Sequence, residues 1–96
     1  MLIARVVGSA VSTIKDMKLT GLKLLIVRET SPNNEITGEP FVAADTVGAG
    51  EGELVLVATG SAARQTLKTD CAAVDAAIVG VLDSLEVNGE TVFFKE

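Results

Sequence analysis

Histidine, tryptophan and tyrosine are absent from this 96-residue sequence, and three phenylalanines are its only aromatic residues. Histidine is the commonest general base and the commonest metal ligand in proteins. Its absence excludes Ser-His-Asp and Cys-His catalytic arrangements within one chain. We therefore expect neither enzymatic activity nor a metal or cofactor site, and we expect a core built from valine, leucine, isoleucine and alanine.

Cysteine is almost absent as well. Cys71 is the single cysteine, so the chain cannot form an internal disulfide and nothing points to an oxidising compartment. No apolar run approaches the roughly 18–20 residues of a membrane-spanning helix. Arg5 and Gly8 interrupt the first apolar run, which argues against a signal peptide. We expect a cytoplasmic protein that does not enter a membrane, with Cys71 as a free thiol without a role.

Positive charge is scarce, because 8 lysines and arginines face 13 aspartates and glutamates, a net charge of −5. Together with the few aromatic rings, this argues against a nucleic-acid partner. Hydrophobic residues make up 48% of the chain, and the mean hydropathy of +0.44 is high for a soluble monomer. Burial of apolar surface between identical copies explains this value; a compact monomer rich in alanine and valine is the alternative. The length predicts a single domain over residues 1–96.

The first 40 residues predict two strands and a loop. Leu2–Thr13 alternates imperfectly, and Gly8 in its middle predicts a bulge or bend. Leu22–Glu29 is apolar on both faces, which in so small a domain requires cover from outside, most simply from a second subunit. Thr30–Pro40 is polar and rich in turn formers, and it predicts a loop.

The stretch Val42–Arg64 organises the rest of the chain, and it predicts a strand, a glycine turn, a second strand and a short helical turn. The strands are Phe41–Val47 and Leu54–Thr59. Between them stand three glycines at alternate positions, Gly48, Gly50 and Gly52. Glycine tolerates positive φ and close backbone approach, so we expect a tight connection pressed against a neighbour. Gly60 ends the second strand, and Ser61 is expected to cap the helical turn.

The C-terminal third is less clear from its pattern. Val74–Val87 is compatible with strand or helix, and its β-branched residues with Gly80 favour strand. Asn88-Gly89 is a strong hairpin signal, and Thr91–Lys95 is expected to return as the last strand. Five or six short strands with one helical turn predict an all-β fold, a small and partly closed barrel.

Two patterns suggest catalytic or ligand-binding chemistry, and both fail in detail. The glycine repeat has neither the third glycine of a dinucleotide fingerprint nor the lysine of a P-loop, and Glu51 and Glu53 would repel phosphate. Asp45-Thr46 resembles the start of an aspartic-protease turn, but Val47 separates it from Gly48. The simpler interpretation is that Asp45 hydrogen-bonds backbone or pairs with a cation such as Arg64.

Several segments together resemble one known family, the pentameric vertex proteins of bacterial microcompartments, the shells of carboxysomes and of ethanolamine- and propanediol-type metabolosomes. The clearest are Asp45–Gly50 (D-T-V-G-A-G) and Gly60–Arg64 (G-S-A-A-R). Lys23-Leu24-Leu25 near the N-terminus and Val74–Asp83 later in the chain match the family in the same order. The resemblance covers almost the whole chain.

The resemblance implies an OB-like barrel and a structural role as a homopentamer that closes the shell at its vertices. The implied partners are hexameric shell proteins, and the implied location is the microcompartment shell in the cytoplasm. It also implies candidate residues for subunit contacts or for the central opening: Asp45, Gly48, Ala49, Gly50, Glu53, Gly60, Ser61, Arg64 and Asp75. For Arg64 we expect an ion pair between subunits. The competing hypothesis is a small acidic OB-like module that binds a protein or a small molecule.

Overall fold

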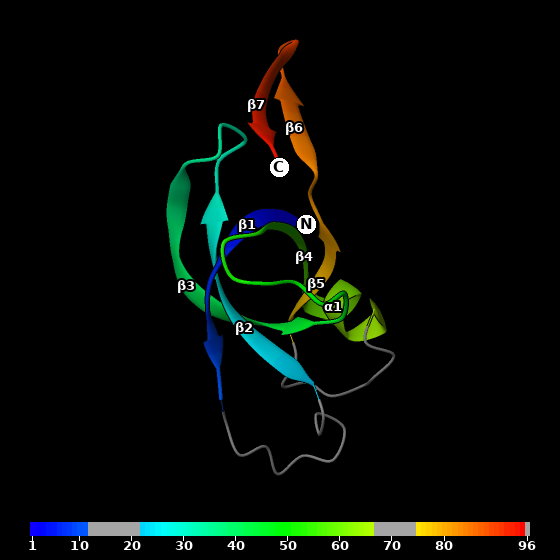
Figure 1. The fold of residues 1–96 in the computed structure, drawn as a ribbon. Coiled ribbons are helices and arrows are strands. Elements are labelled where there is room, and N and C mark those ends of the chain that lie inside the picture. The colour runs from blue at the N-terminus through cyan, green and yellow to red at the C-terminus, as the bar shows by residue number, and fades with distance from the viewer. Residues whose placement is uncertain (12–21, 67–74, 96) are drawn as a thin grey trace.

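The computed structural model describes residues 1–11, 22–66 and 75–95. Over these residues the chain is mostly strand, with one short helix (Figure 1). No helix among them is long and apolar enough to cross a membrane. The elements in chain order are β1 (Leu2–Ala10), β2 (Lys23–Thr30), β3 (Ile36–Asp45), β4 (Leu54–Thr59), α1 (Gly60–Thr66), β5 (Ala76–Val81), β6 (Ser84–Val87) and β7 (Glu90–Phe94).

Five of the strands form a closed barrel in the order β1-β2-β3-β5-β4, and β6 and β7 form a separate hairpin. Neighbouring barrel strands are antiparallel except β3 and β5, which run parallel and pair only at Ala44–Ala77 and Asp45–Ile78. The barrel is therefore weakest at this junction, which we call the seam. The all-β barrel with one short helix, expected from the sequence, is confirmed, with the hairpin standing outside it.

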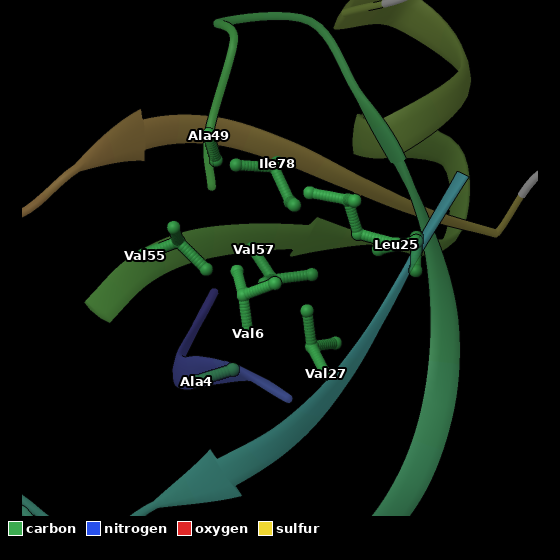
Figure 2. Close-up of a cluster of buried hydrophobic side chains, with 10 residues drawn as sticks. Ala4, Val6, Leu25, Val27, Ala49, Val55, Val57 and Ile78 are labelled. Carbon is green, nitrogen blue, oxygen red and sulfur yellow. The ribbon is translucent and has the colours of Figure 1, made fainter. Parts of the chain in front are cut away.

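Alternate residues of the barrel strands point inward and form a core without tryptophan or tyrosine (Figure 2). On β2, Leu25 and Val27 are buried, whereas Leu24 and Ile26 lie on the outside and are half-buried. The expectation that this strand carries apolar residues on both faces is thus confirmed. The buried core cluster consists of Ala4, Val6, Leu25, Val27, Ala43, Ala49, Val55, Val57, Ala76 and Ile78.

Gly8 lies at the bulge that its position predicted. The pairing of β1 with β2 shifts register between Val6 and Gly8. Before the bulge, Ala4 and Val6 face the core, whereas Val7 within it is exposed. The extra residue lets β1 bend around the barrel while its first half keeps its apolar face inward.

The loop expected over Thr30–Pro40 is wrong in extent. β3 begins at Ile36, so only residues 31–35 form the connection between β2 and β3. Pro40 lies within the strand opposite Arg28. Proline is found on strand edges that lack a partner, and the other edge of β3 pairs with β5 only at Ala44 and Asp45. Because residues 36–40 are mostly polar or turn-forming, the sequence did not indicate this first half of β3.

The ambiguous C-terminal segment forms two strands. β5 ends at Val81, and β6 begins at Ser84 after a short break. The predicted Asn88-Gly89 turn is confirmed, since both residues have positive φ, 54° and 80°. The hairpin projects away from the barrel in Figure 1, on the same side as the β2–β3 connection.

Candidate functional site

The segment 46–53, which we call the glycine turn, is organised by the carboxylate of Asp45. One oxygen accepts hydrogen bonds from the backbone N–H groups of Val47 and Gly48, at 3.0 and 3.1 Å, and the other accepts from Ala49 at 3.0 Å. Asp45 is nearly buried, and these bonds satisfy both of its oxygens. The interpretation that Asp45 bonds backbone is confirmed, and its carboxylate is directed at its own turn, not at a substrate.

The glycines of the turn have a conformational role more than a packing role. Gly48 and Gly52 adopt φ of +79° and +84°, which side-chain-bearing residues rarely adopt, and an added Cβ would meet nothing within 4 Å. The expected close approach is therefore wrong for these two within the subunit. Gly50 does not adopt positive φ, and a Cβ there would make an ordinary 3.5 Å contact with Glu53.

Ala49 has a role in the subunit that the sequence pattern did not reveal. Its side chain is 1% exposed and belongs to the core cluster, next to Ile78 in Figure 2. The glycine turn thus folds across the barrel and inserts one methyl group into it. The available signal was a single apolar residue between two glycines, which composition alone does not separate from an ordinary turn residue.

The glycine turn is also bonded to its surroundings at several points. The backbone of Val6 exchanges hydrogen bonds with Glu53 and Gly52, at 3.0 and 2.8 Å, so the end of the turn continues the sheet beside β1. The Thr46 hydroxyl donates to the Ile78 carbonyl at 2.7 Å. The Lys23 ammonium donates to the Ala49 carbonyl at 3.2 Å. These hydrogen bonds fix the turn to β1, β5 and β2.

Glu53 links this turn to the C-terminal end of the described chain. Its Oε1 accepts from the Gly50 N–H at 2.7 Å, and its Oε2 accepts from Lys95 Nζ at 2.5 Å. The hydrogen bond from Lys95, followed by that from Gly50, lowers the pKa of the Glu53 carboxyl. The same pair raises the pKa of Lys95. Glu53 was a candidate site residue, and its contacts here are structural ones within the subunit.

Arg5 is a second connecting residue, and the sequence analysis did not select it. Its guanidinium donates to the Gly52 carbonyl at 2.6 Å and to the side-chain oxygen of Asn34, and it lies 5.9 Å from the centre of the Phe93 ring. It therefore joins the glycine turn, the β2–β3 connection and the hairpin. Nothing in the sequence signals this, because all three partners are distant along the chain.

Two further candidate residues lie together at the seam. The Gly60 N–H donates to the Asp75 carbonyl at 2.8 Å, where β4 passes into α1. Both residues line a groove of about 760 Å³ whose walls are mainly apolar and include Leu2, Phe41 and Ala76. The groove opens where β3 has left β5, so the short pairing at the seam explains it.

The groove continues onto the outer face of β2 and β3. Leu24, Val42 and Ala44 contribute to its lining, and Val42 is 48% exposed. Ile26 lies beside Val42 in the register of the two strands. We call this combined surface, Leu2, Leu24, Ile26, Phe41, Val42 and Ala44, the seam face. It contains Leu24 and Ile26, the apolar residues on the outer face of β2.

Two candidate residues, Ser61 and Arg64, lie in α1, and their expected roles stay predictions. Ser61 is exposed in the first turn of α1, which begins at Gly60, and its capping role stays a prediction. Arg64 lies in α1, and its expected ion pair between subunits also stays a prediction. Cys71 lies outside the described residues. Among the residues that the structure does describe, no group of three or more carboxylates or thiols could hold a metal ion.

The protein is a small barrel in which Asp45 and Glu53 form hydrogen bonds within the subunit's own turn. Its seam face leaves apolar side chains exposed to solvent. These features define the class of proteins that assemble with copies of themselves. The particular family follows from comparison with known proteins. The family model described as "Ethanolamine utilisation protein EutN/carboxysome" (EutN_CcmL) matches residues 1–83, and the chain belongs to this family.

Individual relatives agree with this assignment. The chain is 44% identical to the bacterial microcompartment shell vertex protein GrpN of Rhodospirillum rubrum over 86 residues, 90% of this chain and 97% of the relative. It resembles the solved structure of an ethanolamine utilization protein, EutN, with a TM-score of 0.91, 38% identity and full coverage of both chains. The structure titled as the pentameric microcompartment shell protein GrpN gives a TM-score of 0.81 at 42% identity, covering 91% of this chain and 99% of that one.

Proposed function

We propose that this chain is a structural protein that forms the pentameric vertices of a bacterial microcompartment shell. The observation that carries the proposal is the combination of family membership with the same barrel as a pentameric shell protein. Flat tiles alone cannot close a polyhedral shell, and a ring of five subunits supplies the curvature because its head-to-tail contacts close on themselves. In this proposal the neighbours of the pentamer are hexameric shell proteins, and the chain has no catalytic role.

We further propose that the seam face is one side of the contact between subunits. Leu24, Ile26 and Val42 present apolar side chains outward, and the adjoining groove leaves Phe41 only partly buried. Burial of such a surface against a neighbouring subunit removes it from water, which is the main favourable term in permanent association. Gly60 and Asp75 line the same groove, which supports a place for them beside the contact. The alternative of a ligand-binding monomer leaves this surface exposed.

Native mass spectrometry tests both proposals. Five copies of the 9.9 kDa chain should give a species of about 50 kDa at micromolar concentration. Val42→Glu places a charge on the seam face and should convert the pentamer into folded monomers, because an unpaired charge is costly to bury. Ile36→Glu is the matched control, since Ile36 is 43% exposed on the same strand but does not line the groove.

The two possible failures are distinguishable. A wild-type protein that stays monomeric at these concentrations contradicts the vertex role. A pentamer that survives Val42→Glu unchanged, with the wild-type mass and stability, leaves the vertex role intact and shows that subunits meet elsewhere.

A further inference from the structure

The β6–β7 hairpin, residues 84–94, is an appendage to the barrel. The molecule measures 45 × 23 × 23 Å, and Figure 1 shows the hairpin extending away from the barrel. Among the described elements, no barrel strand packs broadly against β6 or β7. The matched family range ends at residue 83, immediately before the hairpin. An isolated two-stranded hairpin is marginal in water, so contacts at its base must fix its position.

Those contacts are polar and charged. At the exit from the hairpin, the Lys95 N–H donates to the Asp83 carbonyl at 2.8 Å, and the Lys95 ammonium reaches Glu53 at 2.5 Å. Beside it, the Arg5 guanidinium faces the ring of Phe93 while bonded to the Gly52 carbonyl. We call the Lys95–Glu53 and Arg5–Phe93 contacts the latch. Of its two barrel-side residues, Glu53 belongs to the glycine turn and Arg5 is bonded to it.

The chain just before the hairpin provides a pivot. The Leu82 N–H donates to the Leu54 carbonyl at 2.9 Å, which fixes the last residue tied to β4. Asp83 follows, and β6 begins at the next residue. A rotation at this point would swing the whole hairpin unless its other end were held. The latch holds that other end.

From this geometry we propose that the β6–β7 hairpin is a hinged arm whose angle to the barrel is set by the charged latch and not by apolar packing. The side chains of Lys95 and Glu53 are 42% and 25% exposed, so salt screens their attraction. Glu53 also holds the Gly50 N–H, so one carboxylate fixes both the glycine turn and the arm. A displacement of the turn by a neighbouring protein would therefore move the arm as well.

Hydrogen exchange of the assembled protein, followed by mass spectrometry, tests the arm. Lys95→Met and Glu53→Gln each remove one charge of the latch, and glutamine still offers an oxygen to Gly50. Exchange of the β6–β7 amides should rise about two- to fivefold, the range expected for an exposed ion pair, while β1 and β4 amides keep the wild-type rate. Raising the salt to about 1 M, where the Debye length is near 3 Å, should move the wild type toward Lys95→Met and change that variant less, since it keeps only the Arg5–Phe93 contact.

Lys23→Met is the matched control. It also removes one lysine bonded to the glycine turn, at the Ala49 carbonyl, but it touches no residue of the arm. Its β6–β7 exchange should equal that of the wild type. Unchanged exchange in both latch variants overturns the proposal, and so does an equal rise in Lys23→Met or an equal salt response in Lys95→Met. Native mass spectrometry of each variant confirms that the oligomer under study is the wild-type one.

Discussion

The barrel and the hairpin of this protein are held in place by different forces. The barrel encloses alternate apolar residues from five strands, and the largest of these, Leu25 and Ile78, are 2% and 0% exposed. The hairpin keeps its apolar residues half-buried or exposed, with Phe94 72% exposed, and it is joined to the barrel by Lys95 and Arg5. Burial is non-directional and does not depend on charge, whereas a charged contact is directional and is screened by salt. The barrel is therefore suited to serve as the rigid unit of a ring of subunits, whereas the hairpin is suited to change its angle to the barrel.

The largest difference between the two regions should appear on truncating one leucine in each. Leu25→Ala should lower the free energy of unfolding by about 2–4 kcal/mol, because it loses buried area and leaves a cavity. Leu85→Ala, at a half-buried site on β6 opposite Phe93, should cost less than about 1 kcal/mol. Urea denaturation at one fixed protein concentration measures both. Equal losses in the two variants would contradict the view that the hairpin contributes little to the barrel's stability.

A smaller effect should separate the glycine turn from both regions. Asp45→Ala leaves three backbone N–H groups without their carboxylate partner and should cost about 2–3 kcal/mol. Asp45→Asn should cost less, since its one carbonyl oxygen can still accept from Val47 and Gly48. Urea denaturation ranks the two variants, and hydrogen exchange should show faster exchange at Ala49 in both. If Asp45→Ala unfolded like the wild type, water would have replaced the carboxylate at no cost.

The sequence predicted the barrel well because its signals are local. Apolar residues marked the strands β1, β2 and β4 without showing which face is inward, Gly8 marked the bulge, and Asn88-Gly89 marked the hairpin. The start of β3 at Ile36 was missed because a strand with one nearly free edge tolerates polar residues and a proline. The polar residues at the start of β3 reflect its exposure to solvent, and they do not reveal that its backbone pairs with β2.

The site was less predictable, because its contacts join residues far apart in the chain. Backbone bonding by Asp45, one of the two alternatives that the sequence offered, is confirmed, and its partners lie two to four residues ahead. Arg5 instead contacts Asn34, Gly52 and Phe93, and no single-sequence pattern indicates those pairs. The resemblance made Ala49 a candidate for a subunit contact or the central opening, whereas the closed barrel buries its side chain. Such assignments require the strand order, which pairs β3 with β5 although β4 and α1 lie between them in the chain.

The smallest and most specific effect should be the pH dependence of the arm. Lys95 lowers the pKa of Glu53 below its ordinary 4.5, so the contribution of this carboxylate is complete above pH 4.5 and is lost as the pH falls through the lowered value. Glu53 raises the pKa of Lys95 above 10.5, so the ammonium's contribution is complete below pH 10.5 and is lost as the pH rises through the raised value. The ratio of hairpin to barrel exchange should stay flat between these limits and rise about twofold once the pH has fallen through the lowered pKa of Glu53, where the exposed pair is broken. Asp83 also raises the pKa of Lys95, so Lys95→Met is the reference. Because that variant lacks the Lys95–Glu53 pair, its ratio should change less than the wild-type ratio as the pH falls from 7 through that value. An identical acid response in the two proteins would show that the arm is released by general acid destabilisation and not through the Lys95–Glu53 pair.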